Sequence, residues 1–262
     1  MRKKTKMLCF AAALLLTASC TSYKQVPYLQ NSKMLDTTIV LELYDAKIQP
    51  KDLLTITVSS EDVEAAIPFN LTVGTVQTAS RYVTSQPTLQ TYLVDNAGFI
   101  DFPTLGLLHV GGMTKTEAET MIKEKLRKNF KTDPIVNVRM VNYKISVLGE
   151  VARPNTYTIS NEKVNVFEAL ALAGDLTIYG RRDVVKLIRE NADGTKKVVP
   201  LNLNDANLIY SPYYYLQQND VLYVEPNKAK AQNSDVGSMT SLFFSATSIM
   251  ISIANLLFNI LR

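Results

Sequence analysis

Few side chains in this sequence have the type and spacing that catalysis needs. The chain has one histidine, His109, and two cysteines, Cys9 and Cys20. The sequence shows no glycine-rich phosphate loop, nucleophile elbow or metal-spaced cluster of ligands. Carboxylate pairs that hydrolyse glycosides are defined by their separation in space, so the sequence leaves them open. We expect no enzyme, no metal and no cofactor, and we expect His109 to be a packed or edge residue of a strand.

Cys20 has the clearest chemical role. Four basic residues, an apolar run from Met7 to Leu16 and a short stretch of small residues precede it, which is the order of a secretory signal peptide. The apolar run is too short to span a bilayer, which takes about 20 residues. The Thr-Ala-Ser-Cys sequence resembles a bacterial lipoprotein cleavage site, although Thr17 stands where an aliphatic residue is usual. We predict that residues 1–19 are removed and that the Cys20 thiol is acylated; an uncleaved signal anchor is the alternative.

Removal of the signal peptide changes the charge and the thiol content. Residues 1–19 hold four of the 28 basic residues and no acidic residue, which leaves 24 basic against 24 acidic residues. A mature chain without net charge gives no reason to expect a nucleic-acid partner. Cys9 leaves with the signal peptide and Cys20 carries lipid, so we expect neither a free thiol nor a disulfide.

The last 22 residues, 241–262, carry no charge before Arg262. On a helix with 100° per residue, the polar residues fall within an arc of about 100°. These residues are Ser241, Ser245, Ser248, Ser252, Asn255, Asn259 and Arg262. Apolar residues fill the opposite face, with Thr247 as the one polar exception there. The pattern predicts a two-faced helix about 33 Å long, enough to cross a bacterial outer membrane.

This polar stripe has three interpretations. In a ring of several copies, the stripes would face a water-filled lumen while the apolar faces meet lipid. We favour this arrangement and take the Ser and Asn residues of the stripe as candidates for lining a pore. Small polar residues at helical spacing also hold membrane helices together in a closed bundle. A soluble core helix is the third interpretation, which we favour least because a linker, residues 227–240, precedes the segment.

The residues between the two ends form folded elements. Alternation at Leu54, Ile56 and Val58 predicts a strand with one buried face. Short strands follow in residues 91–110, broken at residues 96–98 and at Pro103. Thr114 and Glu117 have the spacing of a capping box. Ala118, Ile122 and Leu126 recur every four residues after it and predict a helix with one apolar face.

Residues 142–227 predict a second unit with one short helix and about five strands. Asn165, Glu168 and Gly174 mark the cap and the end of the helix. Pro154 and Asn155 predict a turn with Asn155 in the left-handed region. Asp193-Gly194 predicts a hairpin between two strands. Together these signals indicate a small α+β domain.

Two further features concern turns and tyrosines. Residues 48–56 and 216–224 share one pattern, in which Asp52 and Asp220 occupy the same place; we expect both carboxylates to accept backbone N–H groups in tight turns. Four tyrosines, Tyr210, Tyr213, Tyr214 and Tyr215, could stack on sugar rings or lie at a subunit contact. Packing against strands is the interpretation we favour for them. The acidic group at residues 61–64 is expected to be a solvated loop.

The motifs in their order resemble the Wza-type outer-membrane polysaccharide export lipoproteins of bacteria. The resemblance runs from about Ala46 to Pro226, and its most specific parts are residues 103–106 and 149–157. The family usually has Gly where this chain has Lys51, Asn155 and Asn219, which concerns turn geometry. Longer members carry two β-grasp domains, whereas this chain has room for one.

The resemblance implies an α+β fold, with a small mixed-sheet export domain followed by one soluble-ligand-binding β-grasp domain and a C-terminal amphipathic transmembrane helix. We expect a signal peptide at 1–19, a lipid-anchored tether at 20–40, the export domain at 41–141, the β-grasp domain at 142–227, a linker at 228–240 and the helix at 241–262.

The resemblance also implies a function. The chain would be part of an oligomeric outer-membrane translocon, a passive conduit for capsular polysaccharide or exopolysaccharide, with its soluble domains in the periplasm. The implied partners are the polysaccharide, further copies in a homo-oligomeric ring, and an inner-membrane chain-length regulator of the tyrosine-kinase copolymerase type. The alternative is a monomeric, lipid-tethered periplasmic binding or scaffold protein that uses its β-grasp domain.

Overall fold

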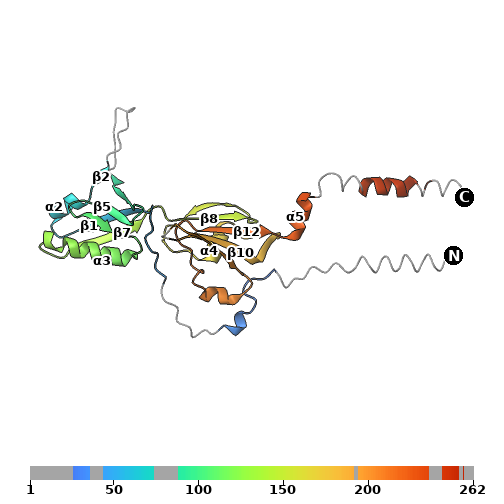
Figure 1. Cartoon of the computed structure of the whole chain (residues 1–262), viewed down its shortest axis with the longest axis horizontal. Helices are drawn as coiled ribbons and strands as arrows, with labels where there is room; N and C mark the ends of the chain where they lie inside the picture. The colour runs from blue at the N-terminus through green and yellow to red at the C-terminus, as the bar shows by residue number, and fades with distance from the viewer. Residues whose placement is uncertain are drawn as a thin grey trace, which may run out of the picture.

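The computed structural model describes residues 26–35, 44–73, 88–191, 194–235, 244–253 and 256. Two lobes lie next to each other along the long axis of the molecule (Figure 1). The first lobe holds the elements from β1 to β7, and the second holds those from β8 to β12. This mixture of helices and sheets confirms the predicted α+β class.

The first lobe is built on a three-stranded antiparallel sheet in the order β4-β1-β7, with α3 packed against β7. Two hairpins, β2–β3 and β5–β6, adjoin the sheet. The elements are β1 (Leu53–Ser59), α2 (Val63–Ala66), η3 (Ile67–Phe69), β2 (Thr72–Val73), β3 (Thr88–Leu89), β4 (Thr91–Leu93), β5 (Phe99–Phe102), β6 (Gly106–His109), α3 (Lys115–Leu126), η4 (Arg127–Asn129) and β7 (Ile135–Met140).

Local signals in the sequence explain this lobe. Every second residue of β1 is buried, as the alternation of Leu54, Ile56 and Val58 predicted. The capping box at α3 is present: the Thr114 hydroxyl accepts the Glu117 N–H, and the Glu117 carboxylate accepts the Thr114 N–H. Ala118, Ile122 and Leu126 are fully buried on the face of α3 that meets the sheet.

The second lobe is a five-stranded mixed sheet in the order β11-β10-β12-β8-β9. The pair β8–β12 is parallel and the other pairs are antiparallel. The elements are β8 (Lys144–Gly149), β9 (Asn155–Thr158), α4 (Val166–Leu172), β10 (Gly180–Glu190), β11 (Lys196–Leu201), η5 (Ala206–Tyr210) and β12 (Val221–Pro226), followed by α5 (Lys228–Asp235). The β10–β11 pairing confirms the predicted hairpin, of which residues 192–193 lie outside the described residues.

The connection from β8 to β9 differs from its prediction. Asn155 is the first residue of β9 and does not have a positive φ. The left-handed residue is Gly149 instead, with φ of 90°, where a Cβ atom would lie 2.0 Å from the Val224 carbonyl oxygen. Glycine is needed there because the close approach of β12 and the positive φ both exclude a side chain.

Residues 26–35, expected to be part of a tether, pack on the second lobe and include η2 (Ser32–Met34). The Leu29 and Gln30 N–H groups donate to the carbonyls of Leu203 and Asn204, at 3.1 and 2.7 Å. The Tyr28 hydroxyl donates to Asp175 at 2.5 Å, and its ring meets Phe167 edge-on. The chain therefore touches the second lobe before it enters the first.

Residues 244–253 and 256 of the C-terminal segment are helical. No helix among the described residues has the length and apolarity to cross a membrane. The transmembrane span expected at 241–262 is therefore not found in the described part, where a ten-residue helix reaches only about 15 Å. The other residues of that segment lie outside the described residues.

Candidate functional site

The two turns that share a sequence pattern have the same geometry. The Gln49 N–H donates to the Asp52 carboxylate at 2.8 Å, and the Gln217 N–H donates to the Asp220 carboxylate at 2.7 Å. Lys51 and Asn219, which precede the two aspartates, are left-handed with φ of 73° and 64°. The structure confirms that both aspartates serve their turns as acceptors of backbone N–H groups.

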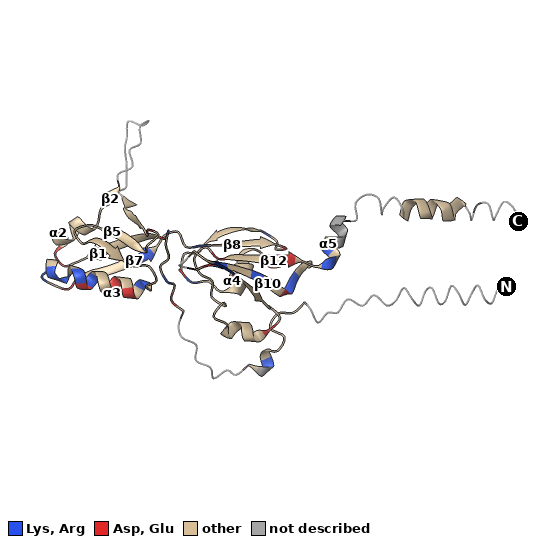
Figure 2. Ribbon diagram, viewed as in Figure 1, with Lys and Arg blue, Asp and Glu red and all other residues tan. Residues whose placement is uncertain are grey.

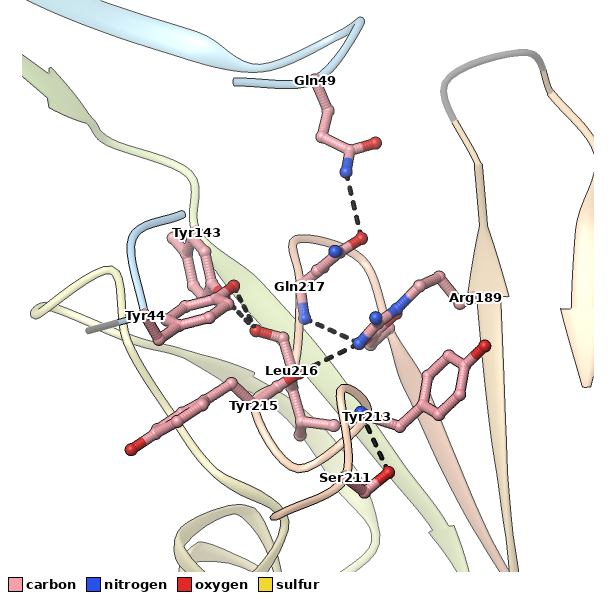
Figure 3. Close-up of polar contacts among 10 residues, drawn as sticks. Tyr44, Gln49, Tyr143, Arg189, Ser211, Tyr213, Tyr215, Leu216 and Gln217 are labelled. Carbon is pink, nitrogen blue, oxygen red and sulfur yellow. Dashed lines mark hydrogen bonds and ion pairs between the residues drawn. The ribbon is translucent and has the colours of Figure 1, made fainter. Parts of the chain in front are cut away.

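These turns meet at the joint between the lobes, although 168 residues separate them. The Gln49 side chain donates to the Gln217 side chain at 3.3 Å (Figure 3). Beside them, Gln218 accepts the Lys144 N–H at 2.7 Å and donates to the Asn142 carbonyl at 2.8 Å. Asn142 in turn accepts the Leu53 N–H at 3.0 Å. The joint is thus a polar network drawn from both lobes and from the segment that connects them.

The electrostatics of the two aspartates differ. Asp220 is ion-paired with Arg189 at 2.6 Å, and Arg189 also donates to the Tyr215 carbonyl at 3.1 Å. Asp52 is equally buried, and its Oδ1 atom has no hydrogen-bond partner among the described residues. Burial raises the pKa of the Asp52 carboxyl from 3.8 to about 6, an effect that the Gln49 N–H and the Gln218 side chain oppose. The Asp220 carboxylate therefore has the Arg189 guanidinium as a counter-charge, whereas the Asp52 carboxyl has no ion-pair partner among the described residues.

Tyrosine side chains also contact the joint between the two lobes. The Tyr44 and Tyr143 hydroxyls both donate to the Leu216 carbonyl, at 2.9 and 2.6 Å (Figure 3). Burial raises the pKa of both hydroxyls, which keeps them as donors. The Tyr44 ring stacks on Tyr215 with centroids 4.8 Å apart, and the Lys163 ammonium lies 4.8 Å from the centroid of the Tyr215 ring.

The remaining tyrosines of the cluster also have partners within the chain. Tyr214 packs partly buried against Phe167, and the Tyr213 ring meets the Arg189 and Lys197 side chains. Tyr213 thus has the packing against strands that we favoured, whereas Tyr214 packs on α4 and Tyr215 packs on Tyr44, which precedes β1. Tyr210, at the end of η5, borders a cavity.

A cavity of about 600 Å³ opens where the two lobes meet. The first lobe contributes Tyr44, Asp45, Lys47 and Thr114 to its wall. The second lobe contributes Ile209, Tyr210, Ser211, Pro212, Tyr215 and Gln217. This wall offers phenol rings, hydroxyls, an amide and one charge of each sign, which is suited to holding a small polar ligand by hydrogen bonds. The sequence could not reveal this cavity because its wall comes from segments about 100 and 170 residues apart in the chain.

The predicted site residues at the chain ends are described only in part. Cys20, Ser241, Asn255 and Asn259 lie outside the described residues. Ser245, Ser248 and Ser252 lie on the helix at 244–253, as their spacing predicted. The Ser248 and Ser252 hydroxyls donate to the carbonyls of Ser245 and Ser248, both at 2.9 Å.

These intrahelical bonds show that the Ser248 and Ser252 hydroxyls do not need water to be hydrogen-bonded. A serine hydroxyl bonded to the backbone of its own helix is satisfied without water, so it tolerates an apolar neighbour. The apolar side chains at 244–253, such as Ile249 and Met250, are exposed within the single chain. They therefore need lipid or another protein surface to cover them.

His109, considered for catalysis, and Asp62, considered for binding a cation or a partner, both have structural roles in the chain. His109 ends β6, is exposed, and meets the Phe99 ring edge-on at 4.9 Å, so it is the edge residue that was predicted. Asp62, of the acidic group, caps α2 by accepting the Ala65 N–H at 3.2 Å. No group of three or more His, Cys, Asp and Glu side chains that could hold a metal occurs in the part of the chain that the structure describes.

Comparison with known proteins agrees with this architecture. Residues 42–141 match the polysaccharide biosynthesis/export protein family, and residues 144–200 match the SLBB domain. The chain is 30% identical over 146 residues to the EPS I polysaccharide export outer membrane protein EpsA of Ralstonia nicotianae, which covers 53% of this chain and 36% of that protein. It is 29% identical over 145 residues to the protein of the same name from Ralstonia solanacearum, covering 54% of this chain and 38% of that protein.

The aligned part spans little more than a third of the length of these relatives. The matched export family is a transport component and not an enzyme, which agrees with the expectation drawn from the sequence. The two matched domains follow each other in the order that the motifs indicated. The export-family match at residues 42–141, followed by the SLBB match at residues 144–200, supports the resemblance of this chain to polysaccharide export proteins of the Wza type.

Proposed function

We propose that this chain is a subunit of an oligomeric outer-membrane translocon that passes capsular polysaccharide or exopolysaccharide from the periplasm to the cell surface. The observation that carries the proposal is the export domain followed directly by the SLBB domain. The names of both relatives, which are outer-membrane proteins of polysaccharide export, support the substrate class and the location.

The two ends of the chain support attachment to a membrane. Acylation of Cys20 would tether the mature chain, with both lobes in the periplasm; stable anchoring takes two or more lipid chains or a second membrane contact. The C-terminal helix supplies such a contact, because its apolar side chains are exposed in the single chain. With several copies in a ring, the face with Ser241, Ser245, Ser248, Ser252, Asn255 and Asn259 would line the lumen.

The chain itself would work as a passive conduit. Uncharged serine and asparagine side chains offer hydrogen bonds to a hydrated polymer without holding it by charge. The force that moves the polymer would come from a partner, an inner-membrane chain-length regulator of the tyrosine-kinase copolymerase type. The first lobe, which lies away from α5, is the part that would face such a partner (Figure 1).

A second candidate function has one observation in its favour. The cavity of about 600 Å³ between the lobes has the size of a small-ligand site, and its mainly apolar wall carries several hydroxyls, an amide and one charge of each sign. A monomeric, lipid-tethered protein that binds a ligand at this cavity would need no pore. Oligomeric state separates the two functions, because a conduit needs several copies and a binding protein does not.

Labelling of single cysteines tests the conduit. The mature chain should lack a free thiol, so Ser248→Cys and Ser252→Cys on the stripe, and Met250→Cys and Ile253→Cys on the other face, each carry a unique label site. We expect a charged maleimide to label the two stripe positions in intact membranes, and cross-linking in mild detergent to give a ladder of several subunits. Equal labelling on both faces, or a monomer only, would contradict the conduit.

A further inference from the structure

The loop between α4 and β10 presents an apolar side chain to solvent. Ile178 is 80% exposed, the highest value among the large hydrophobic residues that the structure describes. The loop is nevertheless held firmly. The Thr177 N–H and hydroxyl both donate to Glu150 at 2.9 Å, and the Gly180 N–H donates to the Thr177 carbonyl at 3.0 Å. Ile178 is thus displayed by a rigid turn.

The same loop is attached to the start of the C-terminal segment. The Asn227 N–H donates to the Tyr179 carbonyl at 2.7 Å. The Lys230 ammonium lies 5.3 Å from the centroid of the Tyr179 ring and 3.6 Å from the Glu150 carboxylate. The helix α5, from which the C-terminal segment continues, therefore begins next to the loop that carries Ile178.

The N-terminal segment reaches the same end of the lobe. Val26, which is 51% exposed, and Ile178 line one cavity of about 610 Å³ together with Arg181, Arg182 and Lys228. Val26 lies six residues after Cys20. Six extended residues span at most about 20 Å. If Cys20 carries lipid, this end of the second lobe is within about 20 Å of the bilayer.

The charges around Ile178 suit a surface of phospholipid head groups. Arg181 is paired with Asp183 at 2.8 Å and with Glu225 at 3.1 Å, and all three side chains are partly exposed. Figure 2 shows basic positions on α5 and on the adjoining part of β10, with an acidic position on β12. Exposed ion pairs are weak, so their cations can turn to lipid phosphates at little cost. An apolar tip among Arg, Lys and Tyr side chains is the composition of an interfacial contact.

We infer that this end of the second lobe docks on the periplasmic surface of the outer membrane, with Ile178 at the level of the phospholipid head groups and with Arg181 and Lys228 facing their phosphates. The inference rests on the proposed lipid anchor at Cys20. It adds to the proposed function a direct lipid contact of the second lobe, made by the loop that carries Ile178.

An environment-sensitive fluorophore tests the docking. Ile178→Cys, labelled with a nitrobenzoxadiazole probe in the full acylated chain, is reconstituted into phospholipid vesicles that carry a spin-label quencher near the head groups. The control is Ile135→Cys at the start of β7, which is 70% exposed but lies on the first lobe. We expect the quencher to reduce the emission at position 178 about twofold and to leave position 135 unchanged.

Each outcome separates the docking from the anchor. Flotation of the vesicles shows first whether the acylated chain is bound to them. If the chain floats but position 178 is not quenched by lipid, the anchor stands and the docking is wrong. If position 178 is shielded from the lipid quencher and from aqueous iodide alike, a second copy of the chain covers it, which also overturns the docking. If the chain does not float, the proposed anchor fails, and the inference fails with it.

Discussion

The variant Asp52→Asn should remove a pH-dependent loss of stability at the joint between the lobes. The Asp52 carboxyl is fully buried, and burial raises its pKa from 3.8 to about 6. An acid whose pKa is higher in the folded protein than in the unfolded chain favours folding when it is protonated. The stabilising effect of the proton is complete below about pH 4 and is lost as the pH rises to about 6.

The size of the effect follows from the two pKa values. The difference of about 2.2, at 1.36 kcal/mol per pKa unit, corresponds to about 3 kcal/mol of lost stability at pH 7. Asparagine does not titrate, and its side-chain oxygen can still accept the Gln49 N–H. The difference in unfolding free energy between the variant and the parent chain should therefore change by about 2 to 3 kcal/mol between pH 4 and pH 7.5.

Urea unfolding of the full chain in mild detergent, followed by far-UV circular dichroism at several pH values, measures this difference. Other titrating groups are common to both proteins and cancel in the comparison. Parallel profiles, within about 0.5 kcal/mol over the whole range, would show that Asp52 is not an unneutralised buried acid and would refute the reasoning.

Asp220→Asn is the matched control because Asp220 occupies the same place in the second turn. Its carboxylate is paired with Arg189 at 2.6 Å, so the substitution breaks a buried ion pair. We expect Asp220→Asn to lose several kcal/mol at pH 7, because the Arg189 guanidinium is left without its counter-charge. The two substitutions should thus act in opposite directions at neutral pH.

Three further predictions concern the rest of the fold. Arg189→Leu should lower the unfolding free energy in urea titrations by about 3 to 5 kcal/mol, since Asp220 is left charged and buried. The double variant Arg189→Leu/Asp220→Asn should recover part of this loss, and a double variant without any recovery would contradict the prediction. Thr114→Ala should cost about 1 kcal/mol by the same measurement because the cap of α3 is lost, whereas Thr116→Ala should cost much less; equal losses would contradict the capping role. Gly149→Ala should lower the melting temperature far more than Gly106→Ala. Both glycines have a positive φ, but only a Cβ atom at position 149 would collide with a carbonyl oxygen, that of Val224. Equal melting temperatures would show that β12 moves aside.

Several elements of the fold could be predicted because local interactions decide them. The capping box of α3 joins residues three apart, and the alternation in β1 reflects the two faces of a strand. The two Asp turns are local as well, since each carboxylate bonds an amide three residues away. The prediction for Asn155 was wrong because the close approach of β12 decides which residue is left-handed there.

The candidate site could be predicted only in its parts. The sequence showed two turns of one pattern and a cluster of tyrosines, but not that Gln49 meets Gln217 or that Tyr44 stacks on Tyr215. Cys20 and part of the serine and asparagine stripe stay predictions, because they lie outside the described residues. The position of residues 26–35 on the second lobe could not be predicted, since its backbone and side-chain bonds join residues more than 140 positions apart in the chain.

The sequence by itself determined the class of this protein: the order of the export and SLBB motifs, the caps, the turns and the two-faced C-terminal segment all follow from residues a few positions apart. Only the tertiary structure decided which segments meet. It gave Asp220 a counter-charge and left Asp52 without one, and it placed Val26, Ile178 and Lys228 at one end of one lobe. The physical reason is that burial and pairing depend on neighbours far away in the chain, and residue spacing does not encode these neighbours.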